Sequence, residues 1–266
     1  MPWLNEFTIG KSILGTLVFA RVGGLVATAP MFGVQAAPVR IRAMLAIALT
    51  MLVLPLQWDV MVVVPDNPAN YGVLLAREAI IGAAIGLGVM ILIAAMGLAG
   101  ELIGYAAGLT ISDVFDPSSG EDTPHFSHLM MLLAICIFLS IGGHRMVMAG
   151  LLDTFQAVPL GSFVSPQSLV DAFTTLVTQS FSLGIRAAAP TVTSLLLATI
   201  ALGLIGRTLP QVNILAVGFG LNAMLTFAVV GLTLGVAAWA FQDRVEPALQ
   251  TILDALQTPA RPEWLS

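Results

Sequence analysis

The sequence predicts an all-α membrane protein, and two observations lead to that prediction. Of its 266 residues, 58% are hydrophobic and only 9% are charged, whereas roughly a quarter of the residues of an ordinary soluble domain are charged. The few charges lie between apolar runs long enough for helices of about 20 residues, the length that crosses a bilayer. A water-soluble surface cannot be built from this composition, so the apolar surface must face lipid or other protein chains.

Six apolar segments give the expected order of long helices, arranged as hairpins. They run near residues 8–32, 40–58, 73–108, 126–143, 169–206 and 213–241. The first ends at Ala29-Pro30 because proline disfavours a helical residue before it, and the Pro-Asp-Asn-Pro stretch at 65–68 predicts a loop. The third and fifth segments exceed one simple span. Either these helices extend past the bilayer, or the segments are not all simple crossings.

The charges at the segment ends do not define an orientation. Under strict alternation, six Lys or Arg side chains fall on one side and three on the other, a weak bias for the positive-inside rule. The N-terminus opens with acidic and aromatic residues and lacks a basic region. It does not resemble a cleavable signal peptide, so we expect the first apolar segment to be retained, and we assign no topology.

Glycines recur at helical spacing and predict closely packed helix faces. Because glycine has no side chain beyond a hydrogen atom, it lets two helix backbones approach each other closely. Packing within the chain and packing against another subunit both explain such a face. The glycines in question are Gly82 and Gly86, then Gly100, Gly104 and Gly108, and finally Gly231 and Gly235.

The stretch 109–124 interrupts the apolar pattern with an acidic loop. It contains four carboxylates and no Lys or Arg, together with Pro, Ser and Gly, a composition typical of irregular backbone. Irregular backbone at membrane depth is tolerated only where it is buried in protein or lines a water-filled cavity. The loop is therefore either a solvated surface connection or a movable element in a pore.

Catalytic and metal-binding patterns do not stand out. There is no P-loop, no G-x-S-x-G elbow and no H-E-x-x-H, so we expect no enzyme and no cofactor. His125 and His128 are better explained as polar residues at a helix entry than as metal ligands. Cys136 is the single cysteine, and the net charge of −5 gives no basic patch for nucleic acid.

Charged residues also lie inside the apolar segments. Arg77, Glu78, Glu101 and Arg186 are functional candidates if the protein is a transporter, because ionisable groups at membrane depth are costly. Pairing between helices or subunits is the structural alternative. A secondary transporter or ion channel of the inner membrane therefore remains an alternative function, although no internal repeat supports it. An intramembrane enzyme would need a catalytic pair on facing helices, and none stands out.

A set of residues spread over nearly the whole chain is distinctive through its order and spacing, rather than through any one motif. The residues are Arg21, Pro30, Phe32, Pro38, Arg40, Arg42, Glu78, Gly82, Gly86, Gly100, Glu101, Gly108, Leu109, Asp116, Pro117, Gly143, His144, Phe155, Pro159, Ala189, Pro190, Gly203, Arg207, Pro210, Gln211, Asn213, Gly218 and Phe219. This set resembles the FliR family, the export-gate proteins of the bacterial flagellar type III secretion apparatus, which are related to the SctT and SpaR proteins of injectisomes.

The resemblance implies a protein-transport function without catalysis. Proteins of this family assemble with FliP and FliQ into a helical gate for unfolded export substrates, in the inner membrane at the flagellar basal body. Residues 1–180 would then resemble a FliP subunit, and residues 181–266 would form a FliQ-like hairpin and a C-terminal tail. The expected partners are FliP-like, FliQ-like, FlhB-like and FlhA-like proteins, unfolded substrates and membrane lipid, with no nucleic acid.

The resemblance also assigns roles to particular residues. The loop within 108–124 matches the family's plug, which helps to close the pore, with Ile111, Val114 and Phe115 as its hydrophobic closure. The expected plug residues are Gly108, Ile111, Val114, Phe115, Asp116 and Pro117. The expected helix-packing and subunit-contact residues are Gly82, Gly86, Gly100, Gly104, Pro190, Arg207, Pro210 and Gln211.

Overall fold

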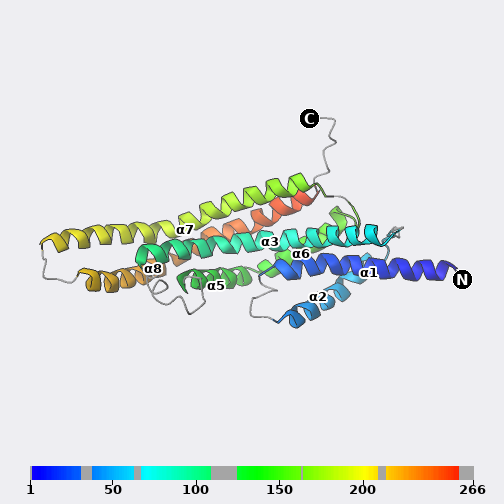
Figure 1. The fold of residues 1–266 in the computed structure, drawn as a ribbon, viewed down its shortest axis with the longest axis horizontal. Coiled ribbons are helices and arrows are strands. Elements are labelled where there is room, and N and C mark those ends of the chain that lie inside the picture. Colours follow the sequence, from blue (N-terminus) through cyan, green and yellow to red (C-terminus); the bar gives the residue numbers. More distant parts are fainter. Residues whose placement is uncertain are drawn as a thin grey trace, which may run out of the picture. The chain divides into compact units, whose positions relative to one another are not determined.

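The structure, a computed structural model, describes residues 2–30, 38–62, 67–108, 125–162, 164–208 and 214–257 (Figure 1). Within these ranges every regular element is a helix, which confirms the all-α prediction. The elements are α1 (Pro2–Thr28), α2 (Val39–Val53), the short 3-10 helix η1 (Leu54–Gln57), α3 (Pro68–Ala107), α5 (His125–Ser140), α6 (Gly143–Ala157), α7 (Pro166–Thr208) and α8 (Ile214–Gln257).

Length and composition suit most of these helices to a membrane. In the described part of the chain five helices are long and apolar enough to cross a bilayer, and a sixth span arises if α5 and α6, bent by 68°, are taken together. The helices α3, α7 and α8 contain 40, 43 and 44 residues, which corresponds to roughly 60–66 Å, about twice a hydrocarbon core of roughly 30 Å. The chain is therefore a helical membrane protein with overlong helices, as the third and fifth apolar segments predicted.

The helices differ most from the sequence prediction at two places. The sixth segment was expected to end at 241, where charged residues appear, but α8 continues to Gln257. Its last turns are amphipathic, with Val245, Ala248, Leu249 and Ile252 buried, so this part is helical through packing on one face. After the fourth segment, Gly142 adopts φ +78°, a left-handed conformation suited to glycine, and a separate helix α6 begins.

The chain divides into two compact units, which we describe separately. The first contains Met1–Ile91, Gly142–Leu176 and Val245–Ser266, and the second contains Leu92–Ile141 and Val177–Arg244. The long helices α3, α7 and α8 each contribute one part to each unit.

Glycines bring α1 and α3 together in the first unit. A Cβ at Gly82 would overlap the backbone carbonyl of Arg21, and a Cβ at Gly24 would overlap that of Ala79. Gly86, one turn after Gly82, lies against Thr28 and the backbone of Ala29. The face predicted from Gly82 and Gly86 is therefore packed within the chain, and the close approach places side chains from both helices in direct contact.

The second unit has its own apolar core around the start of α5. Gly100 of α3 lies against the backbone of Phe126 and Ser127, where a Cβ would approach the Phe126 carbonyl oxygen to 2.7 Å. Phe126 packs edge-to-face on Phe227 of α8, with ring centroids 6.1 Å apart. The buried members of this core are Ala99, Ile103, Phe126, Met130 and Ala188.

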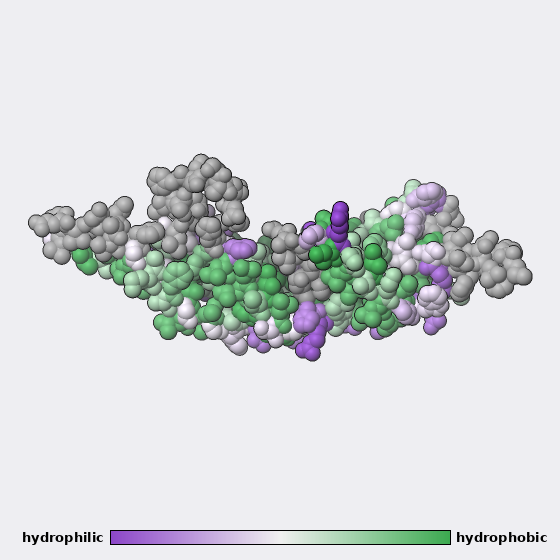
Figure 2. Space-filling view, turned by 90° about the horizontal axis from the view of Figure 1, so that it is seen from below, coloured by the Kyte–Doolittle hydropathy of each residue, from purple (hydrophilic) through white to green (hydrophobic). Residues whose placement is uncertain are grey.

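Large apolar side chains also cover the outer faces of the helices. Figure 2 shows that hydrophobic residues dominate the face seen there, with only scattered hydrophilic positions. On α2 the exposed apolar residues include Met44 and Met51, and on α7 and α8 they include Leu197, Met224 and Leu232. This distribution is typical of surfaces that meet lipid or other subunits rather than water.

Candidate functional site

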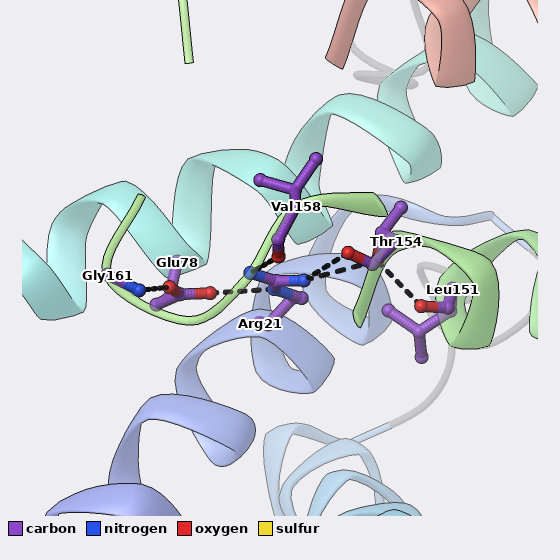
Figure 3. Close-up of polar contacts among 6 residues, drawn as sticks. All are labelled: Arg21, Glu78, Leu151, Thr154, Val158 and Gly161. Atoms are coloured by element: carbon purple, nitrogen blue, oxygen red, sulfur yellow. Dashed lines mark hydrogen bonds and ion pairs between the residues drawn. The ribbon is translucent and has the colours of Figure 1, made fainter. Parts of the chain in front are cut away.

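A buried ion pair between Arg21 and Glu78 is the most highly connected polar feature of the first unit. Arg21 comes from α1 and Glu78 from α3, and both side chains are 0% exposed. The Arg21 Nε donates to Glu78 Oε2 at 2.6 Å (Figure 3). Burying either charge alone costs several kcal/mol, so the two groups neutralise each other at a place that water does not reach.

Arg21 uses its remaining donors to cap helix α6. Its Nη1 donates to the carbonyl oxygen of Thr154 at 3.0 Å and lies 3.4 Å from the Thr154 hydroxyl, while Nη2 donates to the carbonyl oxygen of Val158 at 3.1 Å. The last carbonyls of a helix have no donor within it and carry partial negative charge. The guanidinium therefore lies at the negative end of α6, where it adds a second donor to the Thr154 carbonyl, which also accepts the Val158 N–H, and a donor to the carbonyl of Val158.

Glu78 holds the other side of the same connection. Its Oε1 accepts the backbone N–H of Gly161 at 2.8 Å, and Gly161 lies in the turn between α6 and α7 with φ +83°. The two charged side chains therefore fasten residues 154–161 from both ends, as Figure 3 shows. We call Arg21, Glu78 and the backbone groups of Thr154, Val158 and Gly161 the α6–α7 clamp.

Local sequence explains how the clamp is assembled. Glu78 and Gly82 are four residues apart and share a face of α3, so the glycine that lets α3 approach α1 also delivers the carboxylate to Arg21. Phe155 of α6 covers the guanidinium, with Arg21 Cζ 4.5 Å from the ring centroid, a cation–π contact. The side chain of Arg21 is thus enclosed by three helices.

The clamp is suited to holding structure rather than to reacting. All of its charges are paired and hydrogen-bonded, and neither Arg21 nor Glu78 has an exposed atom for a substrate to reach. In the described residues no group of three or more His, Cys, Asp or Glu side chains is placed to hold a metal ion. What the arrangement can do chemically is fix the path of the chain between α6 and α7.

Sequence reasoning found only part of the clamp. Glu78 was a candidate intramembrane charge, and the alternative of pairing between helices is the one observed, with Arg21 as the partner. Arg21 and Phe155 contributed to the family resemblance without a structural role, and Gly82 was predicted as a helix-packing residue without a link to the two charges. The available signal was one buried charge of each sign in separate apolar segments, one of them four residues from a glycine that packs between helices.

The other predicted site residues are distributed over both units. Gly82, Gly86 and Gly100 pack against helices of this chain, Gly104 is buried in α3, and Pro190 and Arg207 are exposed on α7. Gly108 directly follows α3 and has φ +73°. The remaining predicted residues lie outside the described ranges, namely Ile111, Val114, Phe115, Asp116, Pro117, Pro210 and Gln211.

The fold and the clamp together define a helical membrane protein whose polar interior serves architecture, and comparison with known sequences gives the family. Residues 13–248 match the family described as bacterial export proteins, family 1. The chain belongs to this family and, within it, to the FliR proteins.

Individual relatives agree with this assignment over most of the chain. The flagellar biosynthetic protein FliR of Caulobacter vibrioides is 28% identical over 247 residues, covering 92% of this chain and 98% of the relative. The protein of the same name in Escherichia coli K12 is 32% identical over 76% of this chain and 77% of its own length. That of Pectobacterium carotovorum is 33% identical over 81% and 82%.

Proposed function

We propose that this chain is an export-gate subunit of the bacterial flagellar type III secretion system. In this role it forms, with FliP-like and FliQ-like subunits, the channel through which unfolded flagellar proteins leave the cytoplasm. The single observation that carries the proposal is the match over residues 13–248 to an export family, supported by relatives named flagellar biosynthetic protein FliR.

The hairpin formed by α7 and α8 supports an assembly of this kind. Among the described residues, nothing lies within 4 Å of where a Cβ at Gly203, Gly220, Gly231 or Gly235 would be, in contrast to the tightly enclosed Gly82. Large apolar side chains lie on the same two helices, with Leu232 84% exposed. Small residues beside exposed apolar ones suit close contact with further helices, which neighbouring subunits would supply.

The proposal includes the wider setting of the gate. Residues 1–180 correspond to a FliP-like part and residues 181–266 to a FliQ-like hairpin and tail, a boundary that stays a prediction. The partners are FliP-like, FliQ-like, FlhB-like and FlhA-like proteins and unfolded substrates, and the location is the inner membrane at the flagellar basal body. The chain supplies a passage, and the energy for export comes from other components.

The plug is the proposed moving part of the gate. Gly108 ends α3 in a left-handed conformation, so the chain leaves the helix axis at the residue where the plug begins. Residues 109–124 then supply Ile111, Val114 and Phe115 as an apolar constriction that excludes water and ions by dewetting. Asp116 and Pro117 follow as its polar, turn-forming part.

A conductance experiment tests the plug. Deleting residues 112–121 from the full chain in its assembled gate is expected to leave assembly intact and to make membranes permeable to ions. A matched control replaces only Ser118 and Ser119 with alanine, which keeps the apolar closure and is expected to leave membranes tight. Tight membranes in the deletion variant, with assembly confirmed, would reject the plug assignment.

The alternative function is a secondary transporter or ion channel. Its support is the presence of Glu101 and Arg186 in apolar helices without an ion pair among the described residues. Purification discriminates the two, because a gate subunit is expected to be recovered with several copies of two other small hydrophobic proteins. Recovery of a stable, transport-competent protein consisting of this chain alone would favour the transporter.

A further inference from the structure

Arg186 lies on an apolar helix in surroundings that contrast with those of Arg21. It is exposed on α7, one of the helices suited to membrane crossing, and within the described ranges no ion pair involves it. An exposed arginine on a helix otherwise covered with apolar side chains is costly wherever that surface is removed from water, unless a counter-charge meets it.

The backbone beside Arg186 also has an unmatched hydrogen-bonding group. Pro190 stands four residues later within the helix, and because proline has no N–H, the carbonyl oxygen of Arg186 loses its α-helical donor. In the following turn Thr193 donates to the carbonyl of Ala189 and Ser194 to that of Pro190 at 2.8 Å, while the buried hydroxyl of Thr191 has no hydrogen-bond partner among the described residues. One turn of α7 therefore presents both a charged donor group and a backbone acceptor.

Exposed apolar residues accompany Arg186 on the exposed half of α7. Ile185 is 45% exposed, and Ala189 and Pro190, three and four residues after Arg186, are exposed as well. The opposite side is occupied within the second unit, where Gly184 lies against the carbonyl of Ala95 on α3. An arginine among contacts that exclude water is typical of the residues that contribute most to protein interfaces.

We propose that this face of α7 binds an apolar helix of another subunit, and that this helix carries an Asp or Glu carboxylate opposite Arg186. The contact rests on the proposed function, since it requires that the chain assemble with other membrane proteins. The planar guanidinium binds a carboxylate through two N–H groups. Within this chain Arg21 already pairs with the carboxylate of Glu78, through its Nε–H, and Arg186 is the intersubunit counterpart of that ion pair.

A lipid phosphate is the competing partner for an exposed arginine in a membrane helix. The missing amide donor at Pro190 leaves a backbone acceptor on the same turn as Arg186. A protein helix can satisfy both the guanidinium and this turn, whereas a phosphate, which only accepts hydrogen bonds, can satisfy the guanidinium alone. We therefore assign the face to protein, and the experiment separates it from lipid.

Chemical coupling of a carboxylate to an amine tests the contact directly. Lys11 is the single lysine of the sequence, so the K11R/R186K double variant places one lysine in the whole chain. In the assembled complex, dicyclohexylcarbodiimide is expected to couple the side chain at position 186 to one Asp or Glu of another subunit, located by mass spectrometry. The K11R/R186Q variant is the matched control and is expected to give no such product.

The outcomes separate the contact from the function on which it rests. A cross-link to a carboxylate in an apolar helix of another subunit supports the contact. An intact K11R/R186K complex without an intersubunit product overturns it, as does a lipid adduct alone.

If the lysine variant does not assemble, co-purification of the R186E variant with its partner subunits tests the contact instead. At unchanged chain level, a tenfold loss of co-purified subunits, reversed by an acidic-to-basic change in a partner helix, supports the contact, and unchanged co-purification overturns it. A wild-type chain that purifies alone instead refutes the proposed function.

Discussion

Arg21 and Glu78 lie 57 positions apart in the sequence and meet with their charged atoms 2.6 Å apart and no exposed surface. Their second role is to hold the backbone between α6 and α7, through two carbonyl oxygens and one N–H. The same pair thus joins α1 to α3 and both to the connection at 158–165. Removing either Arg21 or Glu78 therefore affects the contact between α1 and α3, the contact of both helices with α6, and the turn between α6 and α7.

Neutralising one partner of the pair is expected to destabilise the chain strongly. In Glu78→Gln the guanidinium of Arg21 remains buried without its counter-charge, and a broken buried pair costs about 3–5 kcal/mol. Thermal unfolding of the detergent-solubilised complex measures the loss. Asp171→Asn on the exposed side of α7 is the control, with an expected change within about 0.5 kcal/mol. Equal melting temperatures for the two variants would contradict the clamp.

Exchanging the two charges is expected not to restore stability. In the double variant Arg21→Glu with Glu78→Arg the ion pair can form again, but a carboxylate at 21 has no N–H for the carbonyls of Thr154 and Val158. A buried acceptor facing acceptors costs about 1–3 kcal/mol for each unsatisfied group. Limited proteolysis between residues 158 and 165 is expected to be faster in the double variant than in wild type. Wild-type resistance would show that only the charge pairing matters.

Gly161→Ala is expected to strain the turn that Glu78 holds. The residue has φ +83°, and an L side chain in this region costs roughly 1–2 kcal/mol. Gly72→Ala is the matched control, because Gly72 lies in α3 with nothing within 4 Å of a built Cβ, and there alanine is expected to gain up to about 1 kcal/mol. The two melting temperatures should therefore move in opposite directions; a shared direction would contradict the assignment.

Glycines that face inward and outward are expected to respond differently to the same substitution. Gly82→Ala places a Cβ against the backbone of Arg21, and such overpacking costs about 1–3 kcal/mol, so the chain itself should become less stable. In Gly231→Ala the added Cβ meets no atom of the described part of the chain, so the stability of the isolated chain should be unchanged or slightly higher. Under the proposed function the substitution should reduce recovery of partner subunits. Normal recovery would show that no helix packs on this face.

The apolar segments could be predicted because residues close together in the sequence determine their lengths and boundaries. The predicted stop at Ala29-Pro30 lies directly after the end of α1 at Thr28, and α3 begins at Pro68, the last residue of the predicted loop, five residues before the predicted segment start at 73. The extension of α8 to Gln257 was missed because its final turns contain Asp243, Arg244 and Glu246. There the buried positions repeat at helical spacing on one face, a signal that run length does not detect.

The partners of the charged residues could not be predicted from local pattern. Arg21 and Glu78 belong to different segments, and only the packing of Gly82 on α1 determines that they meet. Periodicity specifies which face of a helix is apolar, but it does not specify which other helix covers that face. The predicted plug residues 111–117 lie outside the described ranges, so their roles stay predictions.

The positions of the clamp residues in the sequence determine the order in which their contacts can form during synthesis. Arg21 and Glu78 are synthesised early, with α1 and α3. The backbone groups that they bind, from Thr154 to Gly161, are synthesised later. During synthesis from the N-terminus, the pair of opposite charges is complete after residue 78, which lets both segments enter an apolar environment as a neutral unit. The α6–α7 turn can close only after Gly161 has left the ribosome. Helices α1 and α3 can therefore pair first, and residues 154–161 bind to this pair once they have been synthesised.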